Sequence, residues 1–413
     1  MNVKVIDRIM GSGKTTNMIN YINEKSKSDN DFRFLFVTPY LTEVKRIVDN
    51  TFATECSSNK KSTELIELMK NGKSVVITHE LFKRLKYKDL EKIKYNYTLV
   101  IDEQITLFEL MNDYSSSDFK ILESAKIITS KEGKLIVSDS NFLKEKSMYQ
   151  NLLKSIDNGT IFTENNQFYK IFDINILNFF DNIYILTYLF ENQLLHAYFK
   201  YFNINVEIEK DSKEEERNIK KELKNLINIY EDVIGTKNNL NSNYFIDKTR
   251  NLEKRTALSS SWFDKADNKN IKQLKNNLKN YLLKRNKCFK SENSSPNENI
   301  KFENTILWTT KKEFKKLLES NGNKKGFISL NIKATNEYKD TYNLAYIYNR
   351  FLNPLEKGFF TSNDIKVDED IFALSELIQW IWRSRIRDNK PINIYIPSQR
   401  MRNLLIDWLD NKI

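Results

Sequence analysis

A short segment with two glycines, Arg8-Ile-Met-Gly-Ser-Gly-Lys-Thr-Thr16, constrains the fold of this chain more than any other feature. It follows an apolar run, Val3–Ile6, and leads into a helical pattern of apolar residues that starts at Met18. Only nine glycines occur in 413 residues, and Gly11 and Gly13 are two of them. Glycine lets the backbone turn tightly and bring its N–H groups close to a phosphate. The segment therefore predicts a phosphate-binding loop between a strand and a helix.

The residues of this loop have separate expected roles. Lys14 is expected to contact the β- and γ-phosphates of a nucleoside triphosphate, and the Thr15 hydroxyl to hold Mg²⁺. The other residues expected to bind the phosphates are Gly11, Ser12, Gly13 and Thr16. The full pattern G-x-x-x-x-G-K-[ST] has glycine where this chain has Arg8.

The second informative element is a pair of adjacent acidic residues, Asp102 and Glu103, directly after the apolar run that starts at Thr98. Asp102 is placed to hold Mg²⁺, and Glu103 to orient or deprotonate the attacking water. Two adjacent carboxylates directly after a buried strand favour nucleotide hydrolysis over phosphoryl transfer to a small molecule. A small-molecule kinase is accordingly disfavoured.

Composition limits the class of protein. A chain of 413 residues with 40% hydrophobic and 12% aromatic residues is expected to form two or three globular domains. Apolar runs are too short to span a bilayer, and a strand begins within the first residues, so neither a membrane span nor a signal peptide is expected. Two cysteines and two histidines support neither a disulfide framework nor a zinc site. We expect a cytoplasmic protein.

The charge balance is basic, with 66 Lys and Arg against 55 Asp and Glu. This excess suggests a polyanionic partner, although a solvated basic surface explains it as well. Eight basic residues and no acidic one lie between Lys269 and Lys290. Within that segment Lys272, Lys275 and Lys279 form a stripe on a predicted helix, which either faces a phosphate backbone or is simply solvated.

Alternating strand and helix patterns predict an α/β fold with a parallel sheet covered by helices. The expected strands of the first domain are Val3–Ile6, Phe34–Thr38, Ser74–Thr78, Thr98–Ile101 and Tyr184–Thr187. Two hairpins, at 126–138 and 160–172, predict a β-rich insertion over about 126–175. The expected domains are 1–202, a helical basic region over 203–300 that starts with a capped helix over 212–233, and 301–413.

A second α/β domain without its own phosphate loop is expected to close the chain. Its predicted strands are Asn304–Thr309, Gly326–Asn331, Tyr342–Tyr348 and Ile392–Ile396. Its predicted helices are Phe314–Leu318, Ile371–Arg387 and Arg400–Leu409.

Several short motifs, in this order, resemble those of superfamily 2 helicases of the DEAD/DEAH type, and the resemblance covers most of the chain. The similar segments are Val37-Thr-Pro-Tyr40 (motif Ia), Val76-Ile-Thr-His-Glu80, Leu186-Thr-Tyr-Leu-Phe190 (motif III), Leu307-Trp-Thr-Thr310 (motif IV), Lys333-Ala-Thr-Asn336 (motif V) and Gln379-Trp-Ile-Trp-Arg-Ser-Arg-Ile-Arg387 (motif VI). The chain most resembles a divergent group of these helicases from phages and mobile elements of low-GC bacteria.

The resemblance implies ATP and Mg²⁺ bound by two RecA-like domains, and a nucleic-acid strand that crosses both. The residues that it places on nucleic acid, in addition to the three lysines above, are Thr38, Pro39, Thr78, His79 and Thr335. For His79 a contact with the acidic pair and a hydrogen bond in a loop both stay open. Only two residues precede the first expected strand, so we expect no upstream segment that reads adenine, and the preferred base of the nucleotide is open.

Motif VI of the family has arginines four and seven positions after its glutamine. Counted from Gln379, these positions hold Arg383 and Ile386. On a continuous helix Arg383 and Arg387 share a face, so these two are the expected arginines of the γ-phosphate site, together with Gln379. If the helix ends before Arg385, then Arg385 replaces Arg387 as the expected partner.

Two functions follow from these interpretations. The first is an ATP-dependent helicase or translocase that acts on single-stranded or forked DNA in the replication or recombination of a mobile genome. Such a protein would work inside a bacterial host, with replication or recombination proteins that the sequence does not identify. The second is a nucleotide-switched protein that binds or remodels nucleic acid without processive unwinding. Hydrolysis stimulated by nucleic acid separates the two.

Overall fold

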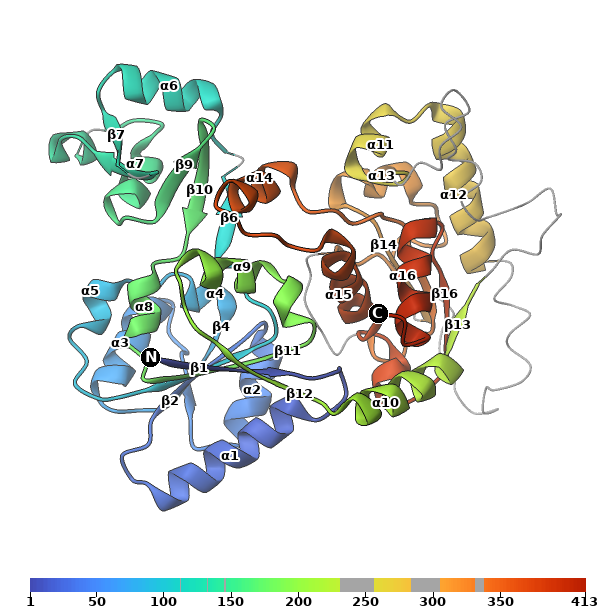
Figure 1. The fold of residues 1–413 in the computed structure, drawn as a ribbon, viewed down its shortest axis with the longest axis horizontal. Helices are drawn as coiled ribbons and strands as arrows, with labels where there is room; N and C mark the ends of the chain where they lie inside the picture. The colour runs from blue at the N-terminus through green and yellow to red at the C-terminus, as the bar shows by residue number, and fades with distance from the viewer. Residues whose placement is uncertain (112, 132, 145, 231–255, 284–304, 331–337) are drawn as a thin grey trace. The chain divides into compact units, whose positions relative to one another are not determined.

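The computed structural model describes all residues except 112, 132, 145, 231–255, 284–304 and 331–337 (Figure 1). The chain divides into two compact units. The first unit contains Met1–Arg8, Gly13–Lys210 and Leu352–Asp368, and the second contains Ile9–Ser12, Asp211–Phe351 and Glu369–Ile413. Each unit is built on a sheet whose strands pair in parallel, so the α/β prediction is confirmed.

The sheet of the first unit has seven strands in the order β12-β1-β11-β5-β2-β4-β3. All of its strand pairs are parallel. The strands are β1 (Asn2–Asp7), β2 (Phe34–Thr38), β3 (Thr54–Glu55), β4 (Val75–Thr78), β5 (Thr98–Asp102), β11 (Asn182–Thr187) and β12 (Glu207–Lys210). Because the strands run the same way, the loop after β1 and the acidic pair after β5 open at the same edge of the sheet.

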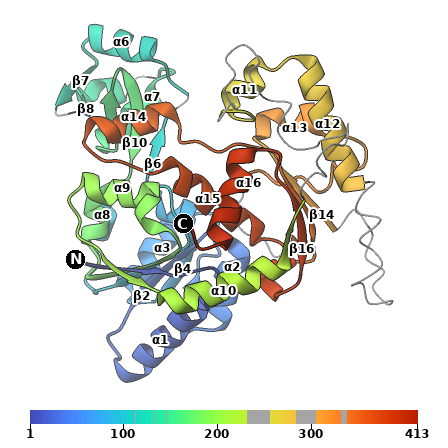
Figure 2. The same cartoon turned by 45° about the vertical axis from the view of Figure 1, so that its right-hand side comes forward.

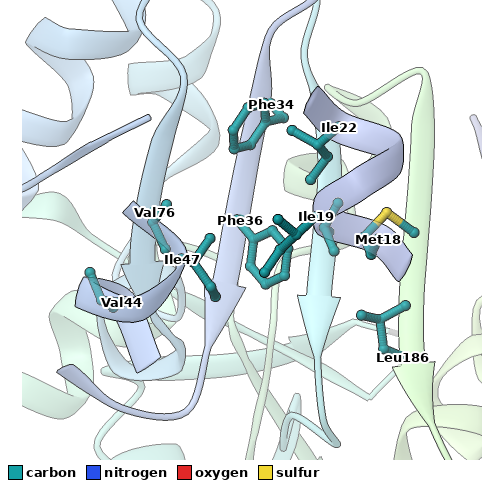
Figure 3. Packing of buried hydrophobic residues seen from close by; sticks show 10 residues of the cluster. Met18, Ile19, Ile22, Phe34, Phe36, Val44, Ile47, Val76 and Leu186 are labelled. Atoms are coloured by element: carbon teal, nitrogen blue, oxygen red, sulfur yellow. The ribbon is translucent and has the colours of Figure 1, made fainter. Parts of the chain in front are cut away.

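Two helices cover one face of this sheet with apolar side chains (Figure 3). Met18 and Ile19 of α1 (Lys14–Ser28) lie four and three residues before Ile22, so each shares a helical face with it. They pack with Phe36 of β2, which is fully buried. The helix α2 (Leu41–Asp49) adds Val44 and Ile47 to the same cluster. This packing fixes the start of α1 at the end of the glycine loop.

Other helices around this parallel sheet are α3 (Lys61–Lys70), α4 (His79–Phe82), α5 (Tyr87–Leu90), α8 (Ile174–Asn178) and α9 (Leu194–Tyr201).

A five-stranded antiparallel sheet is inserted between β5 and β11, in the order β6-β10-β9-β8-β7. Its strands are β6 (Phe108–Leu110), β7 (Ile128–Lys131), β8 (Lys134–Val137), β9 (Ile161–Glu164) and β10 (Gln167–Ile171). Both hairpins are those that the turn signals predict. Helices α6 (Ser116–Ser124) and α7 (Gln150–Asp157) complete a separate apolar core, so this β-rich insertion packs largely on itself.

Helix α14 (Pro354–Ser362) belongs to the first unit, although the chain before Leu352 and after Asp368 belongs to the second. In both views it lies beside β6 and β10 (Figures 1 and 2). The ring of Phe108 is 4.7 Å from that of Phe359 and 4.6 Å from that of Phe360, measured between centroids. The Tyr169 hydroxyl donates a hydrogen bond of 3.2 Å to the carbonyl of Leu355. The sequence patterns do not predict this helix.

The second unit has a four-stranded parallel sheet in the order β13-β16-β15-β14. Its strands are β13 (Ile227–Ile229), β14 (Ile306–Thr309), β15 (Asn343–Tyr346) and β16 (Ile392–Tyr395). Its helices are α10 (Lys213–Leu226), α11 (Ser260–Lys265), α12 (Asn268–Leu283), α13 (Lys315–Leu318), α15 (Glu369–Ile381) and α16 (Gln399–Leu409). Among the described residues, no helix is both long and apolar enough to cross a membrane.

Three predicted elements of this unit differ from the structure. The helix expected over 212–233 ends at Leu226, because the next residues pair with β16 and leave the helix to extend the sheet. The strand expected at Gly326–Asn331 is reduced, in its described part, to one bridge between Phe327 and Trp308. The helix expected over Ile371–Arg387 ends at Ile381.

Candidate functional site

The loop between β1 and α1 has the backbone that a phosphate-binding loop requires. Gly11 has a φ of 85° and Gly13 a φ of 77°, and residues with a Cβ atom rarely adopt such left-handed backbone angles. Gly13 is also the residue that caps the start of α1, and its carbonyl accepts a hydrogen bond of 2.9 Å from the backbone N–H of Asn17. The amino end of a helix attracts an anion. The loop therefore offers a site for phosphate.

Lys14 and Arg8 are held together at this loop. The Nζ atom of Lys14 donates a hydrogen bond of 2.7 Å to the carbonyl oxygen of Arg8. The guanidinium of Arg8 forms an ion pair with Glu209 of β12. That ion pair accounts for a long charged side chain where the general pattern has glycine, because the side chain is directed to the neighbouring strand.

Thr15 and Asp102 lie in contact. The Thr15 Oγ1 is 3.0 Å from Oδ1 and 3.2 Å from Oδ2 of Asp102. Burial, and after it the charge of Glu103, raise the pKa of the Asp102 carboxyl to about 7 in total, against the hydrogen bond from Thr15 and the charge of Lys14, which lower it. A cation bound here would offset the cost of burying this carboxylate.

Glu103 turns the chain sharply after β5. Its φ of 63° is unusual for a residue other than glycine. Its backbone N–H donates a hydrogen bond of 2.9 Å to the carbonyl of Leu186 on β11, which holds the turn. Left-handed backbone at a residue with a side chain costs energy and is concentrated at functional sites. This turn marks Glu103 as a candidate functional residue independently of its chemistry.

His79 packs beneath the acidic pair. Its side chain is 4% exposed, and its Nε2 lies 2.9 Å from the carbonyl oxygen of Asp102. This contact is to the backbone of Asp102 and not to either carboxylate, so the role of His79 at the site stays a prediction. The histidine supports the backbone that presents Asp102 and Glu103.

The structure also brings in residues that the motifs do not identify. Asp7, the last residue of β1, is 6% exposed, and its Oδ2 accepts a hydrogen bond of 3.3 Å from the Phe190 backbone. Burial raises the pKa of the Asp7 carboxyl. Gln193 is fully buried and donates to the Thr187 hydroxyl at 2.9 Å. A buried-strand pattern that ends in Asp7 directly before the loop is the one signal in the sequence that points to it.

The residues that are expected to contact nucleic acid differ in how deeply they are buried and in their hydrogen bonds. Thr38 is fully buried, and its hydroxyl has no hydrogen-bond partner in the described part of the chain. Pro39 is half-buried. The Thr78 hydroxyl accepts a hydrogen bond of 3.3 Å from the backbone of Leu81 and caps α4. Thr335 lies outside the described residues, with the rest of its motif.

The predicted basic helix exists as α12. Leu274, Leu278 and Tyr281 are buried on one side of it. Lys272 and Lys279 are exposed, and the third lysine of the stripe, Lys275, is half-buried. The amphipathic pattern is confirmed, while the partner of its basic side stays a prediction.

The arginine segment corrects one expectation. Because α15 ends at Ile381 and a 3-10 turn follows at Arg385–Asp388, Arg383 and Arg387 do not share a helical face. Arg383 is 6% exposed, Gln379 is half-buried and Arg387 is exposed. With the helix ended before it, Arg385 becomes the expected partner of Arg383.

Arg385 already has contacts within its own unit. Its Nε donates a hydrogen bond of 2.6 Å to the carbonyl of Pro391, and its guanidinium lies 4.3 Å from the centre of the Tyr342 ring. The function of these arginines in hydrolysis stays a prediction.

Magnesium and a triphosphate fit the donors present at the loop. Mg²⁺ prefers oxygen ligands and is usually held by one or two protein groups together with phosphates. The Thr15 hydroxyl and the Asp102 carboxylate are such oxygens, and the buried carboxylate gains from a cation. The loop glycines and Lys14 supply donors for the phosphates.

The raised pKa of Asp102 gives a testable dependence of stability on pH. Above about pH 4 the unfolded chain carries this carboxyl ionised, whereas the folded chain keeps its proton up to about pH 7. The folded state therefore binds more protons, and its stability falls as the pH rises through this range. Without nucleotide, Asp102→Asn is expected to raise the Tm relative to the unchanged protein at about pH 8, with the gain fading at about pH 4.

Asp118→Asn is the matched control, because hydrogen bonds from Ser115 lower the pKa of the Asp118 carboxyl. Its effect has the opposite sign, a lower Tm at about pH 8. A destabilised Asp102→Asn protein at that pH would contradict the explanation.

Comparisons with solved structures find helicases at low similarity. A "DUF1998 helicase MrfA bound to DNA and AMPPNP" is 9% identical with a TM-score of 0.38, covering 100% of this chain and 48% of that one. The present chain thus spans about half the length of MrfA. The S. cerevisiae protein Dbp5, in a structure with Nup159, Gle1, IP6 and ADP, is 11% identical with a TM-score of 0.30, covering 100% and 84%.

Comparisons by sequence are stronger. A family model described as "YonV C-terminal Rossmann-like domain" matches residues 221–409. The "SPbeta prophage-derived uncharacterized protein YonV" of Bacillus subtilis (strain 168) is 36% identical over 439 residues, covering 99% of each chain. This chain therefore belongs to the YonV family.

Proposed function

We propose that this protein is an ATP-dependent nucleic-acid motor, a helicase or translocase that acts on DNA in the replication or recombination of a phage or mobile-element genome. The observation that carries the proposal is the contact between Thr15 of the glycine loop and Asp102 at the end of β5. A phosphate loop alone is common to many nucleotide-binding proteins. The loop joined to a buried aspartate, with Glu103 directly after it, is the arrangement that hydrolysis needs.

The described residues suggest how hydrolysis proceeds. Lys14 exchanges its hydrogen bond to the Arg8 carbonyl for the β- and γ-phosphate oxygens. Thr15 and Asp102 would hold Mg²⁺, which would supply positive charge beside the phosphates. Glu103 accepts a proton from the attacking water. The oxygen of this water bonds to the γ-phosphorus, while the bond between the γ-phosphorus and the oxygen that bridges to the β-phosphate breaks. Gln379 and Arg383, with Arg385 or Arg387, are assigned to the γ-phosphate charge on the resemblance of their motif.

Two further observations support a nucleic-acid partner. The chain carries a net charge of +11, and two lysines of the stripe on α12 are exposed. Cationic side chains on one side of a helix suit a phosphate backbone, which they contact without reading sequence. A prophage origin is stated for the Bacillus subtilis relative, and it supports the assignment to a mobile genome.

The test is the rate of ATP hydrolysis measured without polymer and with single-stranded DNA, duplex DNA or RNA. A motor is expected to hydrolyse ATP many-fold faster with the polymer on which it moves. Polyglutamate, an anionic polymer without bases, is the control for a general electrostatic effect. Slow hydrolysis that no polymer changes would instead favour the nucleotide-switched binding protein, and the absence of hydrolysis would contradict both.

A further inference from the structure

The first unit has a surface pocket of about 300 Å³ that is separate from the glycine loop. Its lining combines positively charged side chains with phenylalanine rings. The residues that matter here are Lys27, Phe32, Arg33, Phe34, Phe52 and Lys73.

The pocket lies at the edge of the sheet opposite the glycine loop. Phe34 is the first residue of β2, and Lys73 shortly precedes β4, so the pocket is at the amino ends of these strands. Thr38 ends β2 at the other edge, four residues later. At about 3.3 Å per residue, the two edges are roughly 13 Å apart along β2. A ligand in this pocket therefore does not occupy the phosphate site.

Phe52 makes the pocket unusual. Its side chain is 73% exposed, whereas Phe34 beside the same pocket is 1% exposed and part of the core. The rings of Phe32 and Phe34 are 6.1 Å apart. Phe52 adds little to the core at this exposure, so its ring is available to stack against a flat partner.

The charge of the lining is entirely positive. Arg33 is held in place by a hydrogen bond of 3.2 Å from its Nη1 to the carbonyl of Phe32, and its guanidinium is 5.6 Å from the centre of the Tyr95 ring. Its ion pair with Asp31 is long, at 4.0 Å, and Asp31 is fully exposed. Lys27 and Lys73 are exposed at the rim. An anion is therefore the expected occupant.

We propose that this pocket binds one nucleotide of a single-stranded nucleic acid, with the base stacked on Phe52 and the flanking phosphates contacted by Lys27, Arg33 and Lys73. Aromatic rings with cations around them are how proteins hold single strands without sequence preference. The proposal rests on the proposed function for the kind of partner. It adds a second contact, on the edge of the sheet away from ATP, that would retain the strand when the nucleotide is absent.

The test is equilibrium binding of a fluorescent oligothymidine to the full chain without nucleotide. Loss of one stacked base costs about 1–3 kcal/mol, so Phe52→Ala is expected to weaken binding roughly tenfold. Phe52→Tyr keeps the ring and is expected to bind as the unchanged protein does. Met148→Ala is the matched control, because Met148 is 78% exposed and outside the pocket. Thermal melting shows that each variant is folded.

A second arm measures the phosphate contacts. Lys27→Gln with Lys73→Gln is expected to lower the slope of log affinity against log salt by about 2, one for each lost contact. Lys25→Gln, an exposed lysine of the same helix outside the pocket, is the control and is expected to leave the slope unchanged.

The outcomes separate this site from the motor. Equal affinity of Phe52→Ala and Met148→Ala for the oligonucleotide would overturn the site and would favour a protein partner for the pocket. That result would not bear on the proposal of polymer-stimulated hydrolysis. Binding that depends on Phe52 in a chain that does not hydrolyse ATP would keep the site and reject the motor. An unchanged protein that binds no oligonucleotide would reject the site.

Discussion

Lys14→Ala is expected to lower the rate of ATP hydrolysis by about 10²–10³-fold, the usual loss when one donor to a developing negative charge is removed. The folded chain should tolerate the change. Lys14 is half-buried, and its hydrogen bond to the Arg8 carbonyl contributes about 1 kcal/mol. The measurement is steady-state hydrolysis at saturating ATP, together with the Tm.

Lys25→Ala is the control for Lys14→Ala, because Lys25 lies on the same helix, in its last turn, and is exposed. It is expected to hydrolyse ATP as the unchanged protein does. Hydrolysis retained in Lys14→Ala would show that the glycine loop does not bind the reacting phosphates. Loss of both hydrolysis and the folded state would attribute the effect to α1 instead.

Glu103→Gln is expected to lower the chemical step of hydrolysis by about 10²–10⁴-fold, which is the usual contribution of a positioned general base. Glutamine has the same shape and keeps the backbone N–H bond to Leu186, so ATP binding should be retained. Single-turnover hydrolysis and nucleotide binding, measured on one preparation, separate the two effects. A variant that still binds but no longer hydrolyses supports the role of Glu103.

Glu80→Gln is a suitable control for Glu103→Gln. Glu80 is exposed and forms a 2.9 Å ion pair with Lys83 outside the acidic pair. Its loss is expected to leave hydrolysis unchanged, since exposed ion pairs contribute little. If Glu103→Gln hydrolyses ATP normally while Asp102→Asn does not, the proton acceptor is another residue.

The sequence predicts the edge of the first sheet that carries the glycine loop and the acidic pair, because the signals for both are local. The strand before Gly11 and the strand before Asp102 each carry their pattern within a few residues, and parallel pairing then brings both ends to one edge. The Thr15–Asp102 contact spans 87 residues but follows from this topology.

Other parts of the fold depend on contacts between residues far apart in the sequence, which no local pattern reveals. The pairing of Arg8 with Glu209 joins residues 201 apart, and Tyr169 contacts Leu355 across 186 residues. The end of α15 at Ile381 is also hidden, because the apolar periodicity runs on to Ile386, which is buried in the following 3-10 turn. Ser384 caps that turn with its side chain, and this local hydrogen bond competes with the helix.

Helix α14 has a consequence for how the polypeptide is made. Phe108 and Tyr169 are each 1% exposed in the finished protein, and both have Phe359 as a ring neighbour. During synthesis these aromatic residues emerge from the ribosome long before Phe359 does. The nascent chain therefore exposes their apolar surface to water until the ribosome has passed α14. A fragment that stops at Lys210 keeps that surface permanently and is expected to aggregate, whereas one expressed together with the α14 segment has the means to cover it.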